Sequence, residues 1–160
     1  MKELTAAFRA LVREVELTEI MPLGFLAGMI GPAPEPGAEV AFEVKPTLST
    51  ARTGEGEHGF MVRGDFVITV RQDTGADEQE DPFLNLRYTV AGRYAVPDNF
   101  AHSLDDALLR QFAETNAMMH LWPYLRAYVS NSCAQFGLPG LMLPVLRQPS
   151  AKRATAHRSE

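Results

Sequence analysis

A histidine and a cysteine are the pair of side chains in this sequence best suited to covalent chemistry. His120 precedes Cys133 by 13 residues, and a thiolate activated by an imidazole is a strong protein nucleophile. If one helix carries both residues, its rise of 1.5 Å per residue separates them by about 20 Å. That separation prevents proton transfer between them, so a packed histidine and a small buried thiol is the simpler interpretation.

The other reactive side chains match no catalytic or metal-binding motif. The sequence has no glycine-rich phosphate loop, no Gly-x-Ser-x-Gly turn and no His-Glu-x-x-His zinc motif. The remaining histidines and the acidic residues of the predicted elements are scattered along the chain: His58, His102, His157, Glu19, Glu39, Glu43, Asp65 and Glu114. We therefore predict a protein that is not an enzyme and needs no metal or other cofactor.

Length and composition favour one globular domain in a reducing compartment. The chain has 160 residues, of which 46% are hydrophobic, and this is enough for one core. No apolar run reaches the roughly 18–20 residues of a membrane-spanning helix, and charges interrupt the first 17 residues, unlike a secretory signal. The lone cysteine has no internal disulfide partner. We expect a cytoplasmic protein without direct membrane insertion.

The distribution of charge argues against a nucleic-acid partner. The net charge is −5, and residues 1–150 alone carry 12 basic and 19 acidic side chains, a net charge of −7. Such a surface repels phosphate. Acidic residues gather between 73 and 81, which we interpret as a solvated hairpin loop. Residues 149–160 are polar and basic and are predicted to form a disordered tail, which leaves 1–148 as one domain.

Apolar and polar residues alternate with a period of two along three segments, over 39–44, 60–71 and 83–96. This alternation predicts an antiparallel sheet with one dry and one wet face. Residues 15–25 form a poorer strand pattern, with Leu17, Met21, Leu23 and Phe25 on one side. Pro22 within this pattern indicates an edge strand or a bulge.

Helical spacing appears before and after these strands. Residues 3–15 predict a short amphipathic helix at the N-terminus. A second helix should begin at an N-cap at Ser103, and a third should run from Leu121 to Phe136 with Pro123 in its first turn and Gly137 at its end. These helices must cover the dry face, so the fold class is α+β, and the wet face meets solvent or a partner protein.

An apolar segment follows the last helix. Six large apolar side chains occupy the nine positions from Leu138 to Leu146, and Pro139 and Pro144 prevent a regular strand there. Such a segment either belongs to the core or forms a surface that accommodates varied apolar ligands.

Two short motifs carry a resemblance to the SecB family of export chaperones. They are Trp122-Pro123-Tyr124-Leu125-Arg126 and Pro139-Gly140-Leu141-Met142-Leu143-Pro144, in the family's order and spacing behind four strands, and the likeness extends with gaps to about Val15. The resemblance implies a four-stranded antiparallel sheet with helices packed on one face. It also implies a homotetramer, built as a dimer of dimers, that holds unfolded polypeptide without ATP.

The resemblance also implies roles for individual residues. The client-binding groove would be lined by Val40, Phe42, Val44, Leu141, Leu143 and Leu146, and the oligomer interface would include Trp122, Tyr124 and Ser130. The partners would be non-native polypeptides, with the SecA motor or an antitoxin as possible specific partners. Arg87 and Arg93 on the wet face differ from the acidic face of export SecB proteins, and the extra N-terminal helix is more typical of SecB-like chaperones that work beside toxin–antitoxin pairs.

Two alternatives remain open at this point. The first is a small α+β ligand-binding or hydrolytic domain with a pocket between sheet and helices, which would require inward polar groups such as His120 or Tyr88. The second is a purely structural oligomerisation module. A ligand-sized cavity in a monomer would favour the first, and a tetramer that exposes no apolar groove would favour the second.

Overall fold

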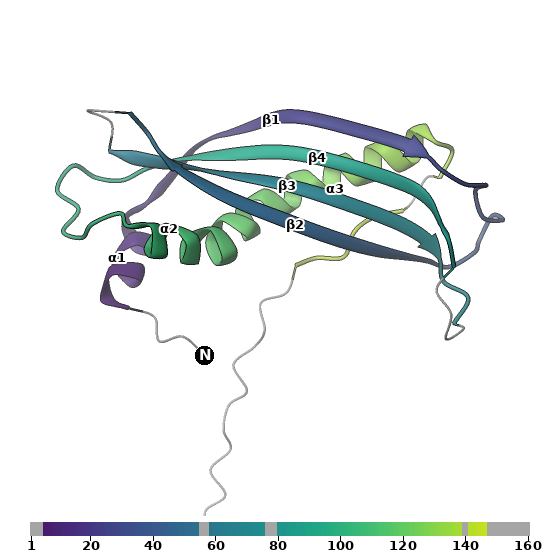
Figure 1. The fold of residues 1–160 in the computed structure, drawn as a ribbon, viewed down its shortest axis with the longest axis horizontal. Coiled ribbons are helices and arrows are strands. Elements are labelled where there is room, and N and C mark those ends of the chain that lie inside the picture. Colours follow the sequence, from purple (N-terminus) through teal and green to yellow (C-terminus); the bar gives the residue numbers. More distant parts are fainter. Residues whose placement is uncertain (1–4, 55–57, 76–79, 139–140, 147–160) are drawn as a thin grey trace, which may run out of the picture.

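The computed structural model describes residues 5–54, 58–75, 80–138 and 141–146. Its elements in chain order are α1 (Ala6–Glu14), β1 (Glu16–Met29), β2 (Val40–Arg52), β3 (Gly59–Gln72), β4 (Pro82–Ala95), α2 (Asp106–Phe112), the π-helical turn η1 (Ala113–Ala117) and α3 (Met118–Gln135). The strands form one antiparallel sheet in the order β1-β4-β3-β2, and the helices lie on one of its faces (Figure 1). The predicted α+β class, with a four-stranded antiparallel sheet and a short N-terminal helix, is confirmed.

The core lies between the two central strands and the helices. Every second side chain of β3 and β4 points to the helices and is buried, as the period-two pattern predicted. One cluster of buried side chains lies beneath α3, and a second lies beneath α1 and α2. In α1, the Thr5 hydroxyl caps the helix by accepting a bond from the Phe8 N–H at 3.2 Å, and Phe8 and Leu11 enter the second cluster.

Strand β1 is an edge strand with two register shifts, between Leu17 and Glu19 and between Pro22 and Gly24. The sequence predicted an edge or a bulge here. The prediction that Met21 shares a face with Leu17 and Phe25 is wrong. Leu17 and Phe25 pair with helix-facing residues of β4, whereas Met21 pairs with Ala91 on the opposite face, because each shift inserts an extra residue and resets the alternation.

The helical part of the chain differs from the prediction of two separate helices. The N-cap is Asp105, whose carboxylate accepts a bond from the Leu108 N–H at 2.8 Å, rather than Ser103. From there α2, η1 and α3 follow one another without a break to Gln135, so Pro123 lies inside a helix and not in its first turn. Gly137, with φ of 75°, follows the end of α3 as predicted.

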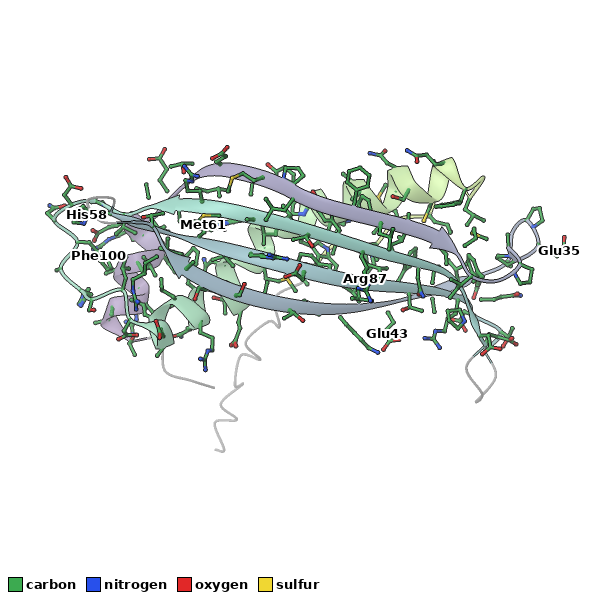
Figure 2. All side chains as sticks on the ribbon, turned by 45° about the horizontal axis from the view of Figure 1, so that its top comes forward. Glu35, Glu43, His58, Met61, Arg87 and Phe100 are labelled. Carbon is green, nitrogen blue, oxygen red and sulfur yellow. The ribbon has the colours of Figure 1, made fainter. Side chains whose placement is uncertain are left out.

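The face of the sheet opposite the helices is not covered by any described element, and it carries Met61, Arg87 and Glu43 (Figure 2). Its carboxylates lie beside cations. Glu19 lies 3.7 Å from Arg93, and Glu43 lies 3.1 Å from both Arg71 and Lys45. The predicted wet face is therefore a surface of mixed and mutually paired charge.

Some predictions concern residues outside the described ranges. These are the tail at 149–160, Pro139 and Gly140 of the second motif, and the middle of the acidic loop at 76–79. Within the described ranges, no helix has the length and apolar character needed to cross a bilayer.

Candidate functional site

The helix-facing side of β2 is less covered than the same side of its neighbour β3. Ile68 and Val70 of β3 are fully buried, whereas the residues paired with them, Val44 and Phe42, remain partly exposed. The difference arises because β2 is an edge strand and the helices pack mainly over the middle of the sheet. Five residues form this row, which we call the β2 strip: Val40, Phe42, Val44 and Leu48, which are partly exposed, and Pro46, which is exposed.

Residues 141–146, which we call the return segment, come back along α3 beneath the sheet (Figure 1). The Trp122 Nε1–H donates to the Pro144 carbonyl at 2.9 Å, and the Arg126 Nε–H donates to the Leu143 carbonyl at 2.7 Å. Trp122 and Arg126 are four residues apart, so they lie on one face of α3. The first motif therefore fixes the second in place, because its two donors satisfy backbone carbonyls that belong to no strand or helix.

Side chains of the return segment point in different directions. Leu143 is only 1% exposed and belongs to the core cluster beneath α3. Leu141 and Leu146 are partly buried against the same cluster, whereas Met142 and Val145 are exposed. Five of the six residues predicted for the groove thus keep accessible surface around one cluster, and Leu143 anchors the segment that carries two of them.

Two clefts lie beside β2. One, of about 390 Å³, lies between residues 33–38 and the end of α3, and it is lined by Val40, Phe136, Leu138 and Leu141. The other, of about 550 Å³, lies between the second half of β2 and the α2–η1 turn. The sequence did not indicate the second cleft, because its walls come from β2 and from helical residues more than 50 positions later in the chain.

The residues predicted for the oligomer interface occupy three different environments. Trp122 is 8% exposed, and its ring and N–H are engaged within the subunit. Ser130 is partly buried, and Tyr124 is 44% exposed on α3. The tyrosine therefore offers the largest accessible surface of the three.

Phe25 and Met29 pair with helix-facing Tyr88 and Leu84 of β4, whereas Leu26 pairs with Arg87 of the uncovered face. Strand β1 therefore exposes large apolar side chains on both faces of the sheet. Its exposed large side chains, with Ile30 just after the strand, are Leu23, Phe25, Leu26, Met29 and Ile30. Phe25 is 76% exposed, although one side of its ring approaches Tyr128 with 6.0 Å between ring centroids. Exposed large apolar side chains along an edge strand are typical of a protein–protein contact.

The two side chains best suited to covalent chemistry are held apart. His120 and Cys133 are carried by the same helix, α3, about 20 Å apart at 1.5 Å per residue, as predicted. Burial lowers the pKa of His120, whose Nδ1 lies 3.2 Å from the Tyr94 hydroxyl, and burial raises the pKa of the Cys133 thiol. The histidine is therefore neutral and the thiol protonated at neutral pH, which does not suit a nucleophilic pair.

The polar groups that an internal ligand pocket would require are packed against aromatic rings. The His120 ring stacks on Tyr94, with 5.8 Å between centroids, and the Tyr88 ring stacks on Tyr128 at 4.6 Å. Among residues 5–54, 58–75, 80–138 and 141–146, no group of three or more His, Cys, Asp or Glu side chains is arranged to hold a metal ion. The described geometry thus favours apolar contact over reaction chemistry.

Two SecB-like chaperones are among the known proteins that are similar to this chain. No protein-family model matches the sequence. The SecB-like chaperone SmegB of Mycolicibacterium smegmatis is 42% identical over 52 residues, which is 32% of this chain and 36% of the relative, so the chain matches about a third of that relative's length. The SecB-like chaperone Rv1957 of Mycobacterium tuberculosis, solved in complex with a ChAD peptide from the antitoxin HigA1 (Rv1956), matches with a TM-score of 0.75 at 18% identity, over 90% of this chain and 99% of the other. The likeness to Rv1957 confirms the fold that the two motifs implied.

Proposed function

We propose that this protein is an ATP-independent, SecB-like chaperone that holds non-native polypeptide and performs no covalent chemistry. The observation that carries the proposal is the accessible apolar surface of the β2 strip and return segment, beside an edge of the sheet with which no described strand pairs. An unfolded segment can bury its own apolar side chains there and pair its backbone with the edge strand. Such binding requires neither a nucleotide nor a metal.

The energetics of this surface suit a chaperone that binds many sequences weakly. Full burial of one large apolar side chain of a client contributes about 1.5–3 kcal/mol. Ordering a flexible segment costs part of this gain, so one contact holds a client poorly. Several such contacts along one client, or on several subunits of one assembly, raise the affinity through effective concentration.

An antitoxin is the client class that we favour, with the cytoplasm as the compartment. The solved relative Rv1957 carries an antitoxin peptide, and this chain has the α1 helix ahead of the sheet. The carboxylates of Glu19 and Glu43 on the uncovered face are paired with arginine or lysine, which does not form the acidic surface implied for docking of SecA. The pairing of charge therefore supports an antitoxin over the export motor.

A homotetramer remains our prediction for the assembly. Tyr124 and the apolar side chains of β1 are available for contacts between subunits, whereas Trp122 acts within its own subunit by holding the return segment. Light scattering coupled to gel filtration measures this directly. We expect a mass of four times the 17.7 kDa of one chain, and a monomer would refute the predicted assembly.

Suppression of aggregation tests the proposed function. Denatured citrate synthase diluted into buffer without ATP should aggregate more slowly with this protein at near-stoichiometric amounts. Reduced and carboxymethylated α-lactalbumin, which stays unfolded, should elute with the protein from gel filtration. If aggregation proceeds unchanged and no complex elutes, the protein is not a holdase.

A further inference from the structure

Strand β2 lies at the edge of the sheet and pairs with β3 over its whole length without a bulge. Just beyond its two ends, the Glu39 carbonyl accepts a bond from the Asp73 N–H at 2.9 Å, and the Thr53 N–H donates to the Gly59 carbonyl at 3.1 Å. Both contacts to β3 involve odd-numbered residues. Because backbone direction alternates along a strand, every odd-numbered residue of β2 directs its N–H and C=O toward β3.

The even-numbered residues of β2 therefore direct their backbone groups away from the sheet, toward any strand that would join it. Their side chains form the β2 strip on the helix-facing side, as the pairing of Val44 with buried Ile68 shows. Pro46 belongs to this even-numbered set. Its missing N–H thus falls at the open edge, which is the one position where a strand tolerates proline without losing an internal bond.

A client strand that pairs with β2 can accept hydrogen bonds from the backbone N–H groups of residues 42, 44, 48 and 50. Residue 46 is proline and offers no N–H. Residues 42 and 50 are about 27 Å apart at 3.4 Å per residue. The opposite client carbonyl at residue 46 receives no bond from the protein. The proline therefore interrupts continuous pairing in the middle of the edge.

The two halves of the edge also differ in the chemistry beside them. The cleft at the Val40 end is lined mainly by apolar residues, among them Phe136, Leu138 and Leu141, although Glu35 also lines it. The cleft at the Leu48 end has Leu48 and Met118 among its lining residues, but its helical wall carries Asp106, Arg110 and Glu114 at four-residue spacing. Asp106 pairs with Arg52 at 2.7 Å.

We propose that Pro46 divides the β2 edge into two client subsites of different specificity. The subsite before Pro46 takes an apolar extended segment. The subsite after it takes a short extended segment whose helix-facing side chains differ in character: one is apolar, toward Leu48 and Met118, and another is charged, toward Arg110 and Glu114. This inference rests on the proposed function, since it specifies which polypeptide segments the same edge accepts.

Restoring the missing donor tests this division. Pro46→Thr and Pro46→Ala both supply an N–H at the open edge, with side chains of different size. The probe is an 11-residue peptide of alternating valine and threonine with one lysine and one glutamate, and its affinity is measured by fluorescence anisotropy. We expect both variants to bind this peptide about 2- to 10-fold more tightly than the parent protein, because each gains one backbone hydrogen bond to it. Thr47→Ala is the matched control, because the backbone of Thr47 already faces β3, and its affinity should not change.

Hydrogen–deuterium exchange of single amides locates the peptide. In the parent protein, a five-residue version should protect either residues 42 and 44 or residues 48 and 50, and the 11-residue peptide should protect both pairs. Unchanged affinity in both Pro46 variants, or protection of both pairs by the five-residue peptide, overturns the division while the chaperone proposal stands. Failure of the parent protein to bind either peptide or unfolded α-lactalbumin overturns both proposals.

Discussion

Leu143 gives the sharpest test of how the return segment is held. Its side chain is 1% exposed within the cluster beneath α3, and two neighbouring backbone carbonyls accept bonds from Trp122 and Arg126. Leu143→Ala leaves a cavity that the fixed surroundings cannot fill, so we expect a loss of about 2–5 kcal/mol in the free energy of unfolding. Val145 lies two residues further along and is 64% exposed. Val145→Ala should change the stability by less than about 0.5 kcal/mol.

Equilibrium unfolding in urea measures both effects. With a slope of about 1–3 kcal/mol per molar urea, a loss of 3 kcal/mol lowers the midpoint by about 1–3 M. The slope itself should stay constant, because the same surface is exposed on unfolding. If Leu143→Ala is no less stable than Val145→Ala, the return segment does not dock against α3, and the proposed wall of the binding surface is wrong. The same burial makes Leu143→Asp unsuitable for testing client binding, since it would destabilise the fold.

Three further predictions follow from single contacts. Phe42→Ala should weaken binding of unfolded α-lactalbumin about fivefold, because it removes about 1 kcal/mol of apolar contact. Val67→Ala on the uncovered face should leave the affinity unchanged. Anisotropy titrations measure the affinity of both variants. Trp122→Phe removes the donor to the Pro144 carbonyl and should lower the free energy of unfolding by about 1 kcal/mol. The amides of the return segment should also exchange faster in this variant than in the parent protein. Burial lowers the pKa of His120, so the unfolded chain takes up a proton first as the pH falls below about 6.5, and stability should decline from pH 7 to 5.5. The His120→Gln variant should lose less stability between pH 7 and 5.5 than the parent protein, as measured by urea unfolding at several pH values. An equal loss in the two proteins would show that His120 does not cause the pH dependence.

The strands were predictable where one periodic signal governs them. In β3 and β4, period-two burial specifies both the strand and its face. The face assignment of Met21 failed because two register shifts in β1 reset the alternation, and local spacing does not reveal where a bulge falls. The alternation of apolar and polar residues indicated β2 only as far as Val44, whereas pairing with β3 keeps the chain extended to Arg52.

The prediction of the candidate site depended on the resemblance carried by two motifs. The resemblance implied a groove lined by Val40, Phe42, Val44, Leu141, Leu143 and Leu146, but it did not show that Trp122 is used within its own subunit. Whether Trp122 is buried depends on where residues 141–146 return, which is a long-range packing outcome that helical spacing cannot indicate. The cleft beside η1 was invisible for the same reason, since its two walls come from β2 and from a helix more than 50 residues later in the chain.

The central claim is that polypeptide binds along the helix-facing edge of β2, and photo-crosslinking tests this claim most directly. A benzophenone amino acid at position 42 reports on the β2 strip, and the same group at position 67 reports on the uncovered face of the neighbouring strand. Irradiation with unfolded α-lactalbumin should yield a crosslinked product from position 42 and little or none from position 67. Equal crosslinking at both positions, or crosslinking from position 67 alone, would contradict the account.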